Sequence, residues 1–164
     1  MEEPLTPAPR PSAEEVIQSL GLVPLPGEGG FFRETYRSPI SLDKSRSIGT
    51  AIYFLITPTS YSLLHRLKSD EMYHFYAGDP VELVLVSPEG QIEMRILGDP
   101  TLPGRVCQHV VPAGWWQGSR LQTGGSWGLL GTTVWPGFDL ADFELALPDD
   151  SRFSSPILRS LLPI

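Results

Sequence analysis

The chain has 164 residues, of which 41% are hydrophobic and 10% aromatic, and this is enough to bury the core of one domain without disulfide support. Its formal net charge of −7 argues against partners with a phosphate backbone or an anionic surface, so neither nucleic acid nor a membrane is expected. A local basic patch at Arg33 and Arg37 is the exception, and would hold a single anion. The single cysteine, Cys107, excludes an intrachain disulfide and is typical of a reducing compartment. We therefore expect a cytoplasmic protein.

The N-terminal residues 1–11 are rich in proline and contain little that can be buried, which predicts a disordered tail. From Ser12 onward the pattern becomes that of a helix. Ser12 and Glu15 form a capping-box signature, and the residues after them place apolar side chains on one face. The sequence therefore predicts a short helix over 12–20, at the start of a single domain that spans 12–164.

Beyond this helix, short β-type segments alternate with turn residues. The expected strands are, in chain order, 30–37, 48–57, 60–67, 71–76, 81–87, 91–97, 105–111 and 127–134. Turn signals such as the tetrad 87–90 separate them. Many short strands at nearly regular spacing, with one helix in front, predict an all-β sandwich or closed barrel. The pattern at 156–162 allows a short final helix.

Strand alternation indicates which side chains share a face, because residues two positions apart point to the same side. If His65 and Glu71 both face inward, then Tyr73 and Phe75 face inward with Glu71, while His74 falls on the opposite face. The expected interior is therefore aromatic and apolar, with one histidine and one glutamate in it.

The segment 65–80 resembles the first motif of the cupin superfamily, in which two histidines and a glutamate hold a divalent metal inside a small β-barrel. His65, Glu71 and Gly78 keep the spacing of that motif. Leu67 stands where the second histidine belongs, two positions after the first. The resemblance therefore implies a cupin pocket and argues against an ordinary cupin metal site.

Residues 112–117 resemble the second cupin motif, with its proline and glycine in place and Gln117 where the last metal-ligating histidine is expected. An amide oxygen can bind a hard cation but is a poor replacement for imidazole on zinc, iron or copper. Two of the four expected ligands are thus replaced. No cofactor is expected, and if a divalent metal is bound its candidate ligands are His65, Glu71 and Gln117.

The resemblance extends over most of the chain, roughly residues 12–147. The segments that carry it are 20–38, 69–71, 136–139 and 142–145. Together they are similar to a branch of the cupin superfamily that is classed as a domain of unknown function (Cupin_5-like). That pattern often has a histidine before Pro26, where this chain has Leu25. The resemblance implies a double-stranded β-helix (cupin, jelly-roll) barrel, a homodimer, and a distant similarity to sugar-nucleotide 3,5-epimerases.

Three functions remain open at this point. In the first hypothesis His65 is a general base oriented by Glu71, with Tyr73 or Tyr36 as the opposing acid, in an epimerase or isomerase reaction on a sugar-nucleotide-like ligand. In the second, the same pocket binds a small molecule without chemistry, and in the third a divalent metal acts through an atypical ligand set. The residues expected to bind the ligand are Arg33, Tyr36, Tyr53, Tyr61, Phe75, Trp115, Gln117 and Trp127. For any single aromatic residue, ordinary core packing is the more frequent outcome.

Overall fold

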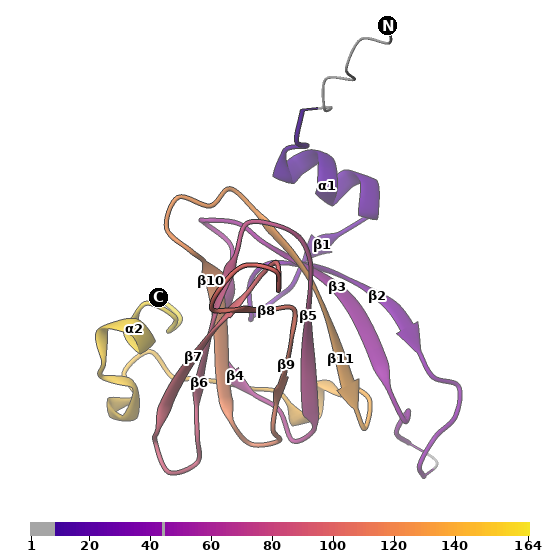
Figure 1. The fold of residues 1–164 in the computed structure, drawn as a ribbon. Coiled ribbons are helices and arrows are strands. Elements are labelled where there is room, and N and C mark those ends of the chain that lie inside the picture. The colour runs from indigo at the N-terminus through magenta and orange to yellow at the C-terminus, as the bar shows by residue number, and fades with distance from the viewer. Residues whose placement is uncertain (1–8, 44) are drawn as a thin grey trace, which may run out of the picture.

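The structure is a computed structural model that describes residues 9–43 and 45–164. Two six-stranded sheets face each other and form a barrel (Figure 1). The first sheet has the order β1 (Val23–Pro24), β2 (Phe31–Arg37), β3 (Thr50–Ile56), β11 (Gly128–Trp135), β5 (Asp70–Gly78) and β9 (Gln108–Val111). The second has the order β12 (Glu144–Leu145), β4 (Ser62–Arg66), β10 (Trp116–Leu121), β6 (Val81–Val86), β7 (Ile92–Leu97) and β8 (Arg105–Val106). The predicted all-β barrel is confirmed.

The predicted N-terminal helix is present as α1 (Ala13–Leu20). The Oγ atom of Ser12 accepts a hydrogen bond from the backbone N–H of Glu15, and the Glu15 carboxylate accepts one from the N–H of Ser12. Gly21 ends the helix in the left-handed conformation, with φ of 63°. None of the described helices is long and apolar enough to cross a membrane.

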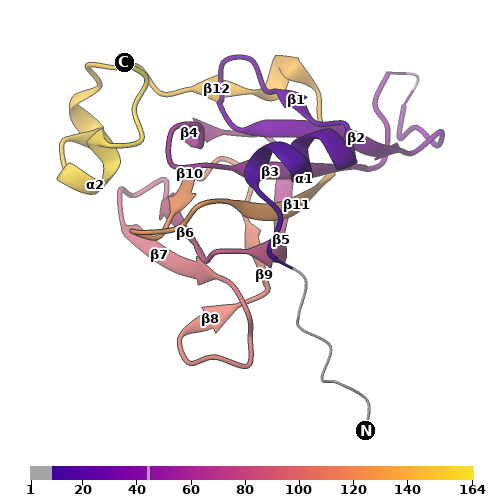
Figure 2. The same ribbon diagram turned by 90° about the horizontal axis from the view of Figure 1, so that it is seen from above.

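The C-terminal segment contains the 3-10 turns η1 (Leu140–Asp142) and η2 (Ser151–Phe153) and the helix α2 (Pro156–Arg159), which is shorter than the predicted 156–162. The part of this segment that contains η2 and α2 lies beside the second sheet, as the two views in Figures 1 and 2 show. Phe153, Leu158 and Leu161 pack there on Leu64 and Trp116 and cover the outer face of that sheet. This cluster is separate from the main core and from the candidate site, which both lie between the two sheets.

The predicted strands differ from the structure in three respects. The short strands β1 and β12 were not predicted. The segment 105–111 is interrupted at Cys107, so that β8 joins the second sheet and β9 the first. Strand β10 was not predicted, because Gln117, Gly118 and Ser119 interrupt the apolar alternation that identifies a strand. This strand lies in the middle of the second sheet, and its polar residues Gln117 and Ser119 are buried.

The predicted tail, 1–11, falls into two parts. Residues 1–8 lie outside the described residues. Arg10, in contrast, forms a bidentate ion pair with Asp79 at 2.8 and 3.0 Å, and its guanidinium lies 4.6 Å from the centre of the Trp127 ring. The indole N–H of Trp127 donates to the carbonyl oxygen of Pro11 at 2.8 Å. The attached part of the chain therefore begins before the predicted boundary at Ser12.

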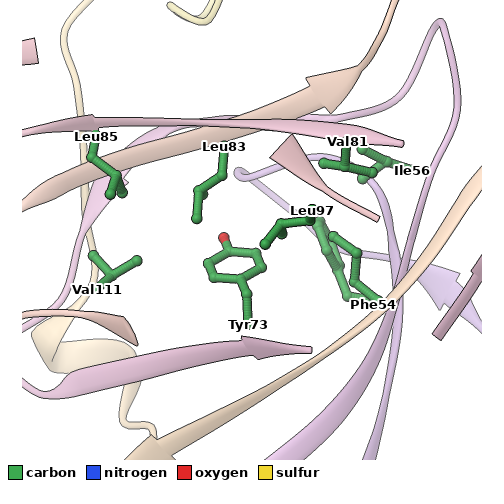
Figure 3. Close-up of a cluster of buried hydrophobic side chains, with 9 residues drawn as sticks. Phe54, Ile56, Tyr73, Val81, Leu83, Leu85, Leu97 and Val111 are labelled. Atoms are coloured by element: carbon green, nitrogen blue, oxygen red, sulfur yellow. The ribbon is translucent and has the colours of Figure 1, made fainter. Parts of the chain in front are cut away.

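The main core cluster lies between the two sheets (Figure 3). Phe54 and Tyr73 come from the first sheet and meet Leu83 and Leu85 from β6 of the second. Each of these side chains is almost fully buried, and burying one apolar side chain of this size contributes about 1.5–3 kcal/mol to stability. The hydroxyl of Tyr73 points towards Leu83 in Figure 3. Phe54 and Tyr73 also border the cavity that contains the candidate site.

Candidate functional site

A cavity of about 340 Å³ lies inside the barrel. Its wall is mostly apolar and includes Phe32, Ile52, Phe54, Leu67, Phe138 and Phe143. Its polar lining includes Glu28, His65, Glu71, Tyr73 and Thr132. The predicted inward direction of His65, Glu71 and Tyr73 is thus confirmed, and so is an apolar and aromatic interior. A cavity with an apolar wall and a few converging polar groups is the usual form of a small-molecule site.

His65 lies on β4 and is only 2% exposed. Its Nδ1 atom is 2.8 Å from the carbonyl oxygen of Leu63, which can only accept a hydrogen bond, so Nδ1 carries the hydrogen. In the neutral ring the lone pair is therefore on Nε2, and this atom lies 3.8 Å from Oε1 of Glu28. The ring stacks on Phe143 with 5.2 Å between ring centres. Its orientation is thus fixed from two sides.

Glu28 was not predicted as a site residue. It lies in the loop between β1 and β2, where Gly27, Gly29 and Gly30 all have positive φ values. A Cβ at Gly29 would overlap the carbonyl oxygen of Tyr61, so this close approach of the loop to β4 needs a glycine. The carbonyl oxygen of Glu28 accepts from the N–H of Leu63 at 2.9 Å and ties the loop to the strand that carries His65. In the sequence, the indication of this site residue is a glutamate that stands between two glycines, Gly27 and Gly29, and it was not recognised as such.

The carboxylate of Glu28 is held from the second sheet as well. The Oγ atom of Ser62 donates to Oε1 of Glu28 at 2.7 Å. This is the same oxygen that lies nearest to His65. Two hydrogen bonds therefore position Glu28 beside the imidazole: one from the N–H of Leu63 to its carbonyl oxygen and one from the hydroxyl of Ser62 to its carboxylate.

Glu71 lies on β5 and is 6% exposed. Burial raises the pKa of its carboxyl, and Glu28 adds to this, while the neighbouring His65 and the donors of Thr132 and Gln117 offset part of it. The Nε2 atom of Gln117 donates to Oε2 of Glu71 at 2.8 Å. The other amide atom, Oε1, is buried and has no donor among the described residues. A protonated Glu71 would add an O–H donor to the contact between Glu71 and Gln117, where Oε1 of Gln117 lacks one within the described part of the chain.

The predicted pairing of His65 with Glu71 is corrected by these contacts. No hydrogen bond joins the two side chains among the described residues: His65 bonds to Leu63, and Glu71 bonds to Gln117. The carboxylate nearest to the imidazole is that of Glu28. Glu71 and His65 therefore face one cavity as separate groups.

Tyr73 borders the cavity from β5 and is 1% exposed. Burial raises the pKa of its phenol well above the ordinary value, and the carboxylates of Glu71 and Glu28 act in the same direction. The hydroxyls of Ser62 and Ser119 offset only part of this effect. The phenol therefore stays protonated and is a weak acid in this position.

None of the eight residues predicted to bind a ligand borders the cavity. A register shift in β2 between Glu34 and Tyr36 leaves Glu34 and Arg37 on the cavity side and turns Tyr36 outward, where it is 57% exposed. Arg33 also lies away from the cavity, with its guanidinium 5.6 Å from the centre of the Tyr53 ring. Arg33, Tyr36 and Tyr53 therefore do not form a wall of the cavity, and the prediction that they bind a ligand there is corrected.

The other predicted ligand-binding residues serve the core or its supports. Phe75, Tyr61 and Trp115 pack against the main core cluster, and the hydroxyl of Tyr61 donates to the carbonyl oxygen of Ser160 at 3.3 Å. Trp127 packs with α1 in a separate cluster. Gln117 does not border the cavity but supports Glu71. Core packing, the more frequent outcome for such aromatics, applies to this set.

The residues at the expected metal position do not fit a cupin metal. Among the described residues, no group of three or more His, Cys, Asp or Glu side chains is arranged to hold an ion. Leu67 presents a hydrocarbon side chain to the cavity, and Gln117 directs its amide nitrogen to Glu71. Neither supplies the ligand that the motif would require at its position.

A two-sheet barrel with a few polar groups in its interior is the architecture of a cupin. The chain belongs to the family Cupin_5, described as "Cupin superfamily (DUF985)", whose profile matches residues 14–146. It is similar to the uncharacterized protein YML079W of Saccharomyces cerevisiae, with 29% identity over 161 residues that cover 88% of this chain and 80% of that protein.

Solved structures of similar proteins have the same fold. A hypothetical protein from Leishmania major has a TM-score of 0.82 and 33% identity, over 93% of this chain and 97% of its own. Protein SO0799 from Shewanella oneidensis has a TM-score of 0.83 and 36% identity, over 93% and 96%. An oxalate decarboxylase from Bacillus subtilis is more distant, with a TM-score of 0.54 and 14% identity over 75% of this chain and 30% of its own. That likeness shows the fold alone.

Proposed function

We propose that this cupin binds a compact organic molecule in the cavity and that His65 exchanges a proton with it. The observation that carries the proposal is the hydrogen bond between Nδ1 of His65 and the carbonyl oxygen of Leu63, at 2.8 Å. It leaves the lone pair of the neutral ring on Nε2, beside the carboxylate of Glu28. A base must be fixed in direction and open to the ligand, and His65 borders the cavity.

Glu71 is the group best suited to act as the opposing acid. Burial raises the pKa of its carboxyl, and this favours the form that can donate a proton. It borders the same cavity as His65 but is held separately, by Gln117. Tyr73, the acid first considered, is a weaker donor because the pKa of its phenol is raised. A base and an acid on one cavity favour proton transfer next to a carbonyl group, as in an isomerase or epimerase.

The catalytic and the purely binding alternatives share this cavity and differ in one measurable property. A catalyst would exchange a carbon-bound hydrogen of its ligand with the solvent, whereas a binding protein would not. We would incubate one-ring and two-ring cyclic ketones that carry a hydroxyl or amine beside the carbonyl with the protein in D₂O, and measure deuterium incorporation by mass spectrometry. The wild type is expected to accelerate incorporation, and His65→Asn is expected to abolish the acceleration.

The matched control is His109→Asn, because His109 lies on β9 and does not border the cavity. This variant should exchange deuterium at the wild-type rate. Equal rates for His65→Asn and the wild type would remove the role of His65 as a base. Binding without any exchange would leave the non-catalytic alternative.

The homodimer implied by the family resemblance stays a prediction, and light scattering of the purified protein would measure it.

A further inference from the structure

Two hydrogen-bond acceptors that lie close together, Nε2 of His65 and Oε1 of Glu28, determine which ligand group can bind beside His65. In the neutral ring, Nε2 of His65 has a lone pair and no hydrogen. Oε1 of Glu28 lies 3.8 Å from this atom, and a carboxylate oxygen is an acceptor as well. Ser62 already donates to this oxygen. Only a group that carries hydrogens can therefore satisfy both atoms.

The charges around the cavity act against an anionic ligand. The carboxyl groups of Glu28, Glu34 and Glu71 all border it, and burial raises the pKa of the Glu71 carboxyl. Arg37 is the one Lys or Arg among the described residues of the lining. Its Nε and Nη2 atoms donate to both carboxylate oxygens of Glu34 at 2.9 and 2.8 Å, and Nη1 donates to the carbonyl oxygen of Phe138 at 3.2 Å. This guanidinium is thus already neutralised, and a phosphate would find no free counter-charge in the lining.

The volume of the cavity limits the size of the ligand. An engineered apolar cavity of about 150 Å³ holds one benzene molecule, so about 340 Å³ holds one or two rings with short substituents. A nucleoside diphosphate linked to a sugar is much larger. The apolar wall, which includes Phe32, Phe138 and Phe143, suits a ring without charge.

We propose that the ligand is a compact ring compound with an amine or hydroxyl head group, and that this head group donates hydrogen bonds to Nε2 of His65 and to the carboxylate of Glu28. The inference rests on the proposed function, since it names the ligand class of the same cavity. An ammonium head is bound more tightly than a hydroxyl, because Glu28 is an acid. The carboxylates of the lining disfavour phosphorylated and carboxylated compounds.

The experiment compares five probes that share one benzyl frame: benzylamine, benzyl alcohol, toluene, phenylacetate and benzyl phosphate. Their Kd values are measured by ligand-detected NMR at one pH and ionic strength. Benzylamine is expected to bind about tenfold more tightly than toluene, which corresponds to one charge-assisted hydrogen bond. Benzyl alcohol should fall between them, and both anions should bind more weakly than toluene.

The variant Glu28→Gln tests the contact, because an amide replaces the carboxylate without a change of size. It should remove the advantage of benzylamine over toluene, while toluene itself still binds and so reports an intact cavity. Glu89→Gln, in an exposed turn, is the matched control and should keep the wild-type order.

The outcomes separate the two proposals. Tighter binding of phenylacetate or benzyl phosphate, equal binding of benzylamine and toluene, or an unchanged order in Glu28→Gln would overturn the ligand class alone. If none of the five probes binds, the cavity is no small-molecule site and the proposed function fails with the inference.

Discussion

Nε2 of His65 and Oε1 of Glu28 lie 3.8 Å apart, although 37 positions separate the two residues in the chain. Their separation is too long for a hydrogen bond and short enough for one donor group to contact both. The loop that carries Glu28 is attached to β4 through the N–H of Leu63, the same residue whose carbonyl oxygen holds the imidazole. One short stretch of β4 thus positions both members of the pair.

Ser62→Ala should destabilise the protein, because the serine is fully buried and donates to Glu28 at 2.7 Å. Loss of a buried donor to a charged group costs about 1–3 kcal/mol. Urea unfolding followed by circular dichroism would measure the change. Ser154→Ala, at an exposed position, should leave the free energy of unfolding within about 0.5 kcal/mol of the wild type. An equal, small effect of both variants would show that Ser62 does not hold Glu28.

Glu71 should make stability depend on pH. Burial raises the pKa of its carboxyl in the folded protein above the ordinary 4.5, so the folded state binds this proton more tightly than the unfolded state. The stability associated with Glu71 is therefore complete below pH 4.5 and decreases as pH rises through the folded pKa. His65 and Glu28 face the same cavity, so the effect of Glu71 must be measured by comparing variants.

Glu71→Gln removes this titration and keeps an acceptor for the amide of Gln117. Relative to the variant, the wild type should lose stability progressively as pH rises above 4.5. Unfolding free energies from urea titrations at several pH values would show the trend. The exposed control Glu89→Gln should run parallel to the wild type. Parallel curves for Glu71→Gln and the wild type would mean that Glu71 is ionised in the fold as it is in water.

Asp79 should make stability depend on pH in the opposite direction from Glu71, because its contribution is lost at low pH. The Arg10 guanidinium, with the N–H groups of Ser126 and Trp127, lowers the pKa of its carboxyl from 3.8 to about 2. The stability it contributes is present above pH 3.8 and is lost as pH falls through about 2. Because Arg10 is partly exposed, we expect Asp79→Asn to cost about 1–2 kcal/mol at neutral pH.

The same variant should flatten the acid limb of the stability curve between pH 3.8 and about 2. Acid unfolding followed by tryptophan fluorescence would detect this, since Trp127 lies against Arg10. The exposed Asp149→Asn is the control and should unfold like the wild type. An acid limb of unchanged slope in Asp79→Asn would contradict the attachment of the N-terminal segment through Arg10.

The absent metal ligands can be restored. The double variant Leu67→His, Gln117→His would complete the ligand pattern of the two cupin motifs with His65 and Glu71. We expect it to bind about one Ni²⁺ or Mn²⁺ per chain, and the wild type to hold only a small fraction of an ion. Metal analysis of protein prepared without a histidine tag measures both. Stoichiometric metal in the wild type would contradict our interpretation of Leu67 and Gln117.

The barrel and three of its site residues could be predicted from local patterns. The resemblance of their spacing to the first cupin motif indicated that His65 and Glu71 face inward, and strand alternation from Glu71 then added Tyr73; all three border the cavity. Glu28 could not be placed in this way, because its contact with His65 depends on how a glycine-rich loop folds back onto β4. Such a non-local contact leaves no periodic signal in the sequence.

Two further errors have local physical causes. A single irregularity in β2 reverses the direction of the side chains after Glu34, so that Tyr36 points outward and Arg37 inward. In β10 the buried polar residues Gln117 and Ser119 replace the apolar alternation of an ordinary strand. A strand that supports a site is therefore harder to predict than one that only fills the core.

The most direct test of the account is the position of the hydrogen on the His65 ring, measured by long-range ¹H–¹⁵N NMR with and without benzylamine. We predict that the neutral ring carries its hydrogen on Nδ1, which donates to the carbonyl oxygen of Leu63, and that the Nε2 resonance shifts when the amine binds. A hydrogen on Nε2 in the neutral ring, or an Nε2 resonance that does not respond to bound amine, would contradict it.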